Sequence, residues 1–305
     1  MTFNGVYSVL PTPFTTSGDL DLQSLRRVID LYIRAGVNGL TALGVTSETA
    51  RLNETEKSKV LETVMQQVNN SVPVIVGTST DGLHTCIEFT RSAKRMNAGA
   101  VMISPPRMPK LNADAVVAHY RKVADAVDIP IVIQDYPPVS GFTMEASLLV
   151  RIAREVPSAR TIKLEDPPTP NKIFRMREQA GDMPLSILGG LGGMYLFEEL
   201  LAGAAGTMTG FAVPEVLVTV VRLFQTDLKD RAAEFFYRNA ALMRFEFQEG
   251  VGMAIRKEML RRRGALTSSF VRPPGAQVDT STKSAIDSLL KWFLDQNKEI
   301  TWTLE

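Results

Sequence analysis

The chain of 305 residues carries 34 lysines and arginines against 33 aspartates and glutamates, so its net charge of +1 provides no general attraction to nucleic acid or an anionic membrane. Its 45% hydrophobic and 22% charged residues are typical of a globular protein. No apolar run reaches the roughly 18 residues of a membrane-spanning helix. We therefore expect neither a nucleic-acid nor a membrane partner.

Cysteine and histidine are scarce in this sequence. The single cysteine, Cys86, excludes an internal disulfide, and the start of the chain has no basic segment followed by an apolar one. Both observations are compatible with a cytoplasmic location. The two histidines, His84 and His119, do not belong to a cluster with metal-ligand spacing, so we expect no metal and no cofactor.

Short apolar runs alternate with amphipathic stretches through the first two thirds of the chain. Leu25, Ile29 and Tyr32 recur at the spacing of one helix face, and Asn53 followed by Glu56 is typical of a capped helix start. The apolar runs predict eight strands: Val6–Leu10, Gly39–Leu43, Pro73–Gly77, Ala100–Ser104, Pro130–Gln134, Thr161–Leu164, Leu185–Leu188 and Gly206–Met208. Eight β-α units without an evident linker predict an α/β fold of the (β/α)8 TIM barrel type.

The strand pattern ends after Gly210. The rest of the chain predicts helices over 214–225, 227–248, 251–263 and 280–296. Only the first of these is needed to complete the eighth unit, so we expect a barrel over residues 1–225 and a C-terminal helical region over 226–305. Three arginines at 261–263 precede Gly264, which is typical of a helix end, where cations meet the negative end of the dipole.

Lys163 stands in the short apolar run Thr161–Leu164, which is typical of a strand buried on both faces. Desolvation favours the neutral form of a lysine, and a neutral amine is the nucleophile that condenses with a ketone to form a Schiff base. A second interpretation is a lysine at a strand end that pairs with Glu165 or Asp166. The segment alone leaves both interpretations open.

Polar residues and glycines gather where the expected strands end. In barrel enzymes the active residues lie at the C-terminal strand ends and in the loops that follow. The segments at these positions are Gly44–Glu48, Ser104–Arg107, Gln134–Tyr136, Lys163–Glu165, Gly189–Gly190 and Thr209–Gly210. We expect the functional site at this rim of the barrel.

Several short motifs occur in an order and spacing that is specific when they are taken together. They are Val9–Phe14, Gly44–Glu48, Ile162–Lys163, Gly189–Gly190, Ala202–Ala204 and Arg272–Pro274. With these motifs the chain resembles the dihydrodipicolinate synthase / N-acetylneuraminate lyase family of Schiff-base lyases over nearly its whole length. The resemblance implies a barrel with a helical appendage, a small 2-oxo acid as substrate, a homotetramer or homodimer, and Lys163 as the Schiff-base lysine.

The segment Gly44–Glu48 resembles the Gly-Thr-Thr-Gly-Glu signature of that family. The resemblance implies that Val45, Thr46 and Ser47 surround the substrate carboxylate, and amides at the start of a helix do favour an anion. Val45 and Ser47 depart from the signature, while Thr46 keeps its hydroxyl. A polar turn that caps the next helix is the alternative interpretation.

Other departures concern the proton relay of the synthase branch, which uses a threonine and two tyrosines. Those positions correspond here to Val45, Arg107 and Gln134, and an arginine that binds the second substrate of that branch corresponds to Val139. Lysine biosynthesis is therefore disfavoured. The Gln-Asp-Tyr-Pro sequence that starts at Gln134, with Lys163-Leu-Glu165, is more similar to the branch of 2-keto-3-deoxy-sugar-acid dehydratases of the L-2-keto-3-deoxyarabonate type.

We predict Lys163, Gln134 and Glu165 as catalytic residues, with Glu165 either tuning the lysine or serving only as its ion-pair partner. Asp135 is expected to alternate away from the interior. The predicted substrate-binding residues are Thr46, Ser47, Val45, Arg107, Tyr136, Gly189 and Thr209. Tyr136 follows Gln134 by two positions and shares its strand face, so it is a possible replacement for the missing tyrosine. For Arg107, a solvated loop arginine is the alternative.

The function predicted from the sequence is dehydration of a 2-keto-3-deoxy sugar acid through a lysine Schiff base. One alternative is a pyruvate-dependent aldolase or synthase, including 4-hydroxy-tetrahydrodipicolinate synthase. The loss of the tyrosine relay supports a further alternative, a non-catalytic protein that binds a 2-oxo acid.

Overall fold

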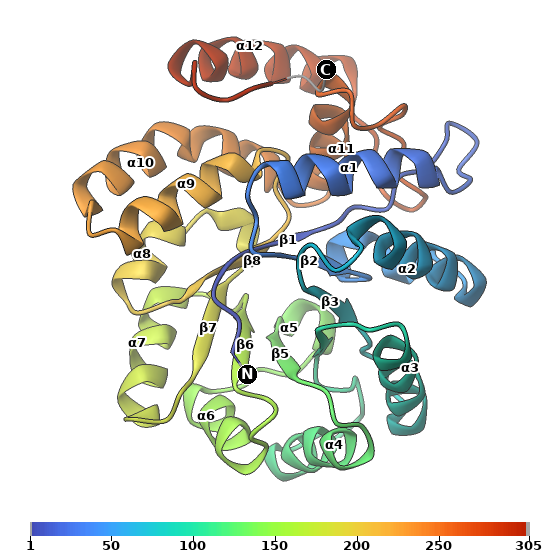
Figure 1. The fold of residues 1–305 in the computed structure, drawn as a ribbon, viewed down its shortest axis with the longest axis vertical. Coiled ribbons are helices and arrows are strands. Elements are labelled where there is room, and N and C mark those ends of the chain that lie inside the picture. Colours follow the sequence, from blue (N-terminus) through green and yellow to red (C-terminus); the bar gives the residue numbers. More distant parts are fainter. Residues whose placement is uncertain (1, 303–305) are drawn as a thin grey trace.

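The computed structural model describes residues 2–302, and it contains a closed barrel of eight parallel strands in the order of the sequence (Figure 1). The strands are β1 (Gly5–Val9), β2 (Gly39–Ala42), β3 (Val74–Gly77), β4 (Ala100–Ile103), β5 (Ile131–Asp135), β6 (Thr161–Leu164), β7 (Ser186–Gly189) and β8 (Gly206–Thr209). Pairing of β1 with β8 closes the ring. The predicted TIM barrel is confirmed, with small shifts at the strand ends.

Helices follow the strands around the outside of the barrel (Figure 1). They are α1 (Leu22–Arg34), α2 (Glu54–Val68), α3 (Leu83–Arg95), α4 (Ala113–Ala126), α5 (Pro137–Ser140), α6 (Ala146–Glu155), α7 (Thr169–Ala180), α8 (Leu196–Leu201) and α9 (Pro214–Gln225). Short 3-10 turns are η1 (Val45–Ser47), η2 (Thr49–Arg51) and η3 (Leu191–Gly193). None of the helices within residues 2–302 has the length and apolar character needed to cross a membrane.

Local sequence signals account for the start of α2 and for the packing of α1. Asn53 accepts a hydrogen bond from the Glu56 amide and the Glu56 side chain accepts one from the Asn53 amide, which is the capping box expected from the sequence. In α1, the face formed by Leu25, Ile29 and Tyr32 is fully buried against the core. A capping motif for α2 and a periodic apolar face for α1 therefore sufficed to predict these two helices.

Alternation along the strands divides the side chains between the barrel interior and the layer of helices. The interior is filled by a separate apolar cluster of Phe3, Tyr7, Val9, Ile75, Ala100, Met102, Val132, Leu188 and Met208. Lys163 is the cross-strand neighbour of both Gln134 and the interior residue Leu188. Because paired residues share a face of the sheet, Lys163 and Gln134 also point into the barrel, next to its C-terminal end.

The C-terminal region contains α10 (Lys229–Glu246), α11 (Gly252–Arg262) and α12 (Thr280–Gln296), which lie together on the side of the barrel near α9 and α1 (Figure 1). The predicted helices are confirmed here. Phe235, Phe236 and Met243 on α10 are buried within the chain. The boundary between residues 1–225 and 226–305 stays a prediction.

Of the three arginines at 261–263, Arg263 has a role that the helix-end interpretation did not include. The helix α11 does end at Arg262, as expected. The Arg263 side chain is fully buried, donates to the carbonyl oxygen of Ala212 at 2.7 Å and forms an ion pair with Glu215. Arg263 thus ties the C-terminal region to the barrel segment after β8.

Candidate active site

Lys163 lies on β6 inside the barrel, with only 2% of its surface exposed. Its Nζ is 2.9 Å from Oε2 of Glu165, two residues further along the same strand face. Asp166, the other partner considered from the sequence, pairs instead with Lys172 at 2.8 Å. The amine therefore meets one carboxylate in a site largely closed to solvent.

Gln134 and Ser104 hold this carboxylate from the neighbouring strands. Nε2 of Gln134 donates to Oε2 of Glu165 at 2.9 Å, and Oε1 of Gln134 accepts from the Ser104 hydroxyl at 3.1 Å. A carboxylate only accepts hydrogen bonds, so the NH2 end of the amide faces Glu165 and the oxygen end is left for the Ser104 hydroxyl. Lys163 and Gln134 thus both contact Oε2 of Glu165. Ser104 belongs to the same network, although the sequence did not single it out as a site residue.

Gly190 provides the space that the Glu165 side chain occupies. A Cβ atom at Gly190 would lie 2.3 Å from Cγ of Glu165, a distance that van der Waals contact forbids. This explains why a glycine follows β7 at a position that faces the interior.

A cavity of about 540 Å³ lies at the mouth of the barrel, and Glu165, the partner of Lys163, is in its wall. Thr46, Tyr136 and Glu165 line it from the barrel side. Burial raises the pKa of the Tyr136 phenol, and the carboxylates of Glu165 and Glu249 raise it further, so Tyr136 is protonated at neutral pH.

The opposite wall of this cavity comes from α10, α11 and the turn between them. Its residues are Glu246, Phe247, Gln248, Glu249, Gly252, Met253 and Arg256. Sequence reasoning missed all of them as site residues, because only the packing of the C-terminal region brings them to the barrel mouth. A polar and charged cluster between two helices, as at 246–249, was the available signal.

The segment Gly44–Glu48 forms a tight turn at the edge of the cavity. The Ser47 hydroxyl donates to the carbonyl of Leu10 at 2.6 Å and accepts from the Gly44 amide at 3.1 Å, so both of these hydrogen bonds are made to the backbone of the fold. The Thr46 hydroxyl is buried without a hydrogen-bond partner among residues 2–302. Val45 is 41% exposed. Of the three residues, Thr46 is the one that lines the cavity with an unused hydroxyl.

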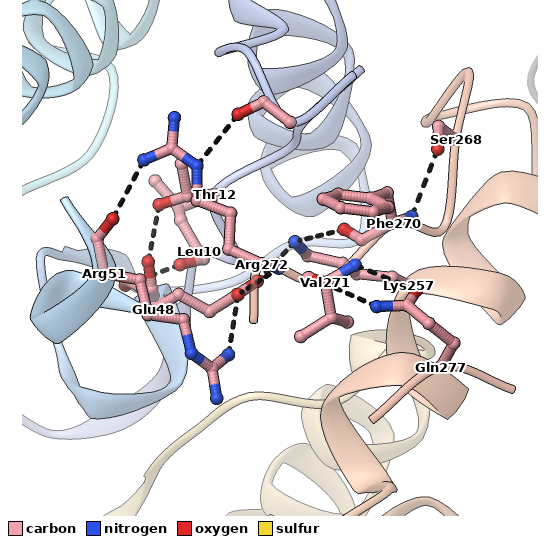
Figure 2. Close-up of polar contacts among 12 residues, drawn as sticks. Leu10, Thr12, Glu48, Arg51, Lys257, Ser268, Phe270, Val271, Arg272 and Gln277 are labelled. Carbon is pink, nitrogen blue, oxygen red and sulfur yellow. Dashed lines mark hydrogen bonds and ion pairs between the residues drawn. The ribbon is translucent and has the colours of Figure 1, made fainter. Parts of the chain in front are cut away.

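Glu48 at the end of this turn is anchored by cations from two parts of the chain (Figure 2). Its carboxylate pairs with Arg51 at 2.7 Å and with the buried ammonium of Lys257 on α11. The Arg272 amide donates to Glu48 Oε2 at 3.3 Å. Burial lowers the pKa of Lys257 to about 8, against the opposing effect of Glu48. The turn is therefore fixed to the C-terminal region, which no local motif indicated.

Gly189 and Thr209, both predicted to bind substrate, lie on the outward faces of their strands. A Cβ atom at Gly189 would lie 1.7 Å from Oε2 of Glu199 on α8, so this glycine makes room for a buried carboxyl group. The Thr209 hydroxyl accepts from the Gly192 amide at 2.9 Å and thereby supports η3 beside the cavity. Both residues therefore support the rim of the barrel from the helix-facing side of the sheet.

Arg107 and Asp135 lie away from the cavity. Arg107 is exposed on its loop, where its amide donates to Asp81 at 2.8 Å, as in the solvated alternative. Asp135 faces the helices, where its carboxylate pairs with Lys172 at 2.5 Å. The expectation that Asp135 alternates away from the interior is confirmed.

Metal-ligating side chains do not gather anywhere in the described part of the chain. Among residues 2–302, no group of three or more histidine, cysteine, aspartate and glutamate side chains is placed to hold a metal ion.

Glu199 makes the stability of the fold depend on pH. Burial raises the pKa of its carboxyl from 4.5 to about 8, with the Thr169 hydroxyl opposing this shift. Between those pH values the unfolded chain releases a proton that the folded chain retains, so the stabilising effect present below pH 4.5 is lost as the pH rises. We expect the free energy of unfolding of wild type, relative to Glu199→Gln, to fall by up to about 1.4 kcal/mol per pH unit.

Urea unfolding of both proteins at several pH values between 5 and 8 measures this difference. Glu198→Gln is the matched control, because Glu198 adjoins Glu199 but is partly exposed. A constant difference between wild type and Glu199→Gln across this range would contradict the expectation.

The chain is similar to known proteins over nearly its whole length. A sequence model of the dihydrodipicolinate synthetase family matches residues 2–292. L-2-keto-3-deoxyarabonate dehydratase of Azospirillum brasilense is 30% identical over 92% of this chain and 92% of its own length. A 4-hydroxy-tetrahydrodipicolinate synthase of Methanothrix thermoacetophila is 32% identical over 81% of this chain and 83% of its own.

Among solved structures, dihydrodipicolinate synthase from Rhodopseudomonas palustris superposes with a TM-score of 0.89 at 35% identity. The alignment covers 95% of this chain and 97% of that one. Sequence and structure therefore agree with the resemblance that the motifs suggested. The chain belongs to the dihydrodipicolinate synthetase family.

Proposed function

We propose that this protein is a lyase that forms a Schiff base between Lys163 and a 2-oxo acid, and that it dehydrates a 2-keto-3-deoxy sugar acid of the L-2-keto-3-deoxyarabonate type. The observation that carries the proposal is the Lys163 amine, buried inside the barrel 2.9 Å from Glu165. A lysine placed in this way lies in a largely water-free site beside one carboxylate, the arrangement that a Schiff-base amine and a neighbouring acid or base require.

In the proposed reaction, the neutral Lys163 amine attacks C2 of the substrate, and loss of water gives an iminium ion. The iminium acidifies the C3 protons, and a base removes one to give an enamine. The enamine then expels the C4 hydroxyl, which takes up a proton and leaves as water, and an unsaturated iminium remains on Lys163. Attack of a second water on C2 breaks the C2–N bond, releases the dehydrated 2-oxo acid and restores the free amine. Glu165 is the base nearest the lysine, and Gln134 orients its carboxylate by hydrogen bonding to Oε2.

Two observations support the dehydratase over the synthase. The position of a relay tyrosine is taken by Gln134, whose amide is already hydrogen-bonded to Ser104 and Glu165. The position of the substrate-binding arginine is taken by Val139, an apolar residue that is 38% exposed. The similarity to an L-2-keto-3-deoxyarabonate dehydratase over 92% of the chain points in the same direction.

The second candidate is a pyruvate-dependent aldolase or 4-hydroxy-tetrahydrodipicolinate synthase. It is favoured by relatives with synthase names, at 32% identity for one sequence and 35% for one structure. In this reaction pyruvate takes the place of the sugar acid on Lys163. Retention of the lysine without turnover would correspond to the further alternative, a protein that only binds a 2-oxo acid.

The first prediction concerns the covalent step. Borohydride reduction in the presence of pyruvate or L-2-keto-3-deoxyarabonate should add one substrate mass to the protein, and proteolytic mapping should place it on Lys163. Lys163→Ala should form no adduct and lose turnover, since no other amine faces Glu165 in the described network. Lys122→Ala, at an exposed position of α4, is the control and should label fully.

The outcomes separate the candidates. An adduct with water release from L-2-keto-3-deoxyarabonate supports the dehydratase, and condensation of pyruvate with aspartate semialdehyde supports the synthase. Adducts without any turnover correspond to the binding protein. A full adduct in Lys163→Ala would overturn the assignment of the lysine.

The second prediction tests Glu165 without altering it. Gly190→Ala should push the Glu165 side chain away from Lys163, because the new Cβ would lie 2.3 Å from its Cγ. We expect kcat to fall by roughly 10²-fold, the usual contribution of a positioned acid or base. Gly82→Ala is the control, since its nearest contact would be an ordinary 3.5 Å. Unchanged kcat in a folded Gly190→Ala protein would reduce Glu165 to an ion-pair partner.

We also propose a homotetramer or homodimer in the cytoplasm. Phe174 on α7 and Leu201 on α8 support an interface, because they are 60% and 59% exposed beside the same shallow cavity. Light scattering after size-exclusion chromatography should give a multiple of 33.6 kDa. Phe174→Asp should lower the mass, whereas a wild-type mass of one chain would contradict the assembly.

A further inference from the structure

Arg256 on α11 is a buried arginine in the wall of the cavity that Glu165 also lines. Only 3% of it is exposed, and its Nε donates to Oε1 of Glu246 at 2.6 Å. Glu246 Oε2 accepts from the Ala212 amide at 3.0 Å, which fixes the carboxylate and through it the guanidinium. The arginine is thus held in place at the barrel mouth.

The guanidinium has donor capacity that the fold does not use. Its Nη1 is buried without a hydrogen-bond partner among residues 2–302. Nη1 fills the place of a side chain at Gly210, where a Cβ atom would lie 2.0 Å from it. Gly210 directly follows β8, so this nitrogen lies against the backbone at the C-terminal end of that strand. An unpaired buried donor is costly, which favours a partner that enters with a ligand.

The charges of the cavity wall indicate the chemistry of that ligand. The wall contains the carboxyl groups of Glu165, Asp166, Glu246 and Glu249, and Arg256 is its one cation among the described residues. Lys163, Lys172 and Arg256 pair with the first three of these, which leaves Glu249 to repel a second carboxylate at the outer end of a substrate. Uncharged hydroxyl groups suit this wall, because each accepts from a guanidinium and donates to a carboxylate.

We propose that Arg256 is a specificity-determining residue that donates a hydrogen bond to a hydroxyl oxygen beyond C4 of the substrate. This inference rests on the proposed function. With C2 bound to Lys163, which lies beneath Glu165, the distal carbons have to extend into the cavity that Arg256 lines. The substrate class is accordingly a 2-keto-3-deoxy acid with an uncharged, hydroxylated end.

The test compares two substrates that differ only at the distal end. L-2-keto-3-deoxyarabonate ends in a hydroxymethyl group, C5, attached to C4, whereas 4-hydroxy-2-oxobutanoate ends at C4. Both are measured by kcat/KM and by the concentration that half-saturates borohydride trapping, so that one readout does not require turnover. Pyruvate trapping serves as the reference for an intact Lys163.

The variants are Arg256→Lys and the double variant Arg256→Met with Glu246→Gln, which removes the Glu246 carboxylate together with the guanidinium that neutralises it. Glu246→Gln alone and Arg261→Met are the matched controls, the latter because Arg261 lies on the same helix with its side chain 44% exposed. Circular dichroism and the unfolding midpoint confirm that each protein is folded.

We expect the double variant to lose about 10- to 100-fold in kcat/KM for the five-carbon acid, the usual range for a hydrogen bond from a charged donor. The four-carbon acid and pyruvate trapping should change less than about threefold. Equal losses for both acids, or no loss for either, would overturn the role of Arg256. If wild type traps pyruvate yet neither binds nor turns over the five-carbon acid, this inference fails while the Schiff base stands. No pyruvate adduct would overturn the proposed function itself.

Discussion

The geometry of the site depends on one constraint, the alternation of side chains along the parallel strands of a closed barrel. Lys163 is paired in register with Gln134 and Leu188, and Leu188 belongs to the interior cluster, so the lysine has to point inward. Alternation then places Glu165 and Gly190 on the same face, one step nearer the mouth. A slip of one residue in β6 would send the amine out to the helices.

A second constraint on the site is a buried ion pair that joins distant parts of the chain. The turn that follows β2 ends at Glu48, whose carboxylate is buried against Lys257 of α11 (Figure 2). Removing one partner of such a buried pair typically costs about 3–5 kcal/mol, because the other charge stays in a low-dielectric environment. Docking of the C-terminal region therefore stabilises the turn that lines the cavity at Thr46.

The C-terminal region contributes to the proposed chemistry as well as to stability. Adjacent residues of α11 divide these roles, since Lys257 anchors Glu48 and Arg256 faces the cavity. The barrel strands supply the proposed Schiff-base lysine, and the C-terminal helices supply the cavity wall that we propose to select the substrate. Because function is determined by the site and not by the fold, a change in that wall would alter the proposed substrate without a change in the barrel.

The sequence by itself determined the order of strands and helices, the barrel and the position of Lys163 at a strand end. These follow from local periodicity and from a short apolar run around one charged residue, signals that are contained within a few consecutive positions. It could not determine the bonds of Ser104 or Thr209, the outward direction of Gly189, or the approach of Arg256 and Lys257 to the mouth. Those depend on contacts between segments up to about 200 residues apart, and only packing of the whole chain decides them.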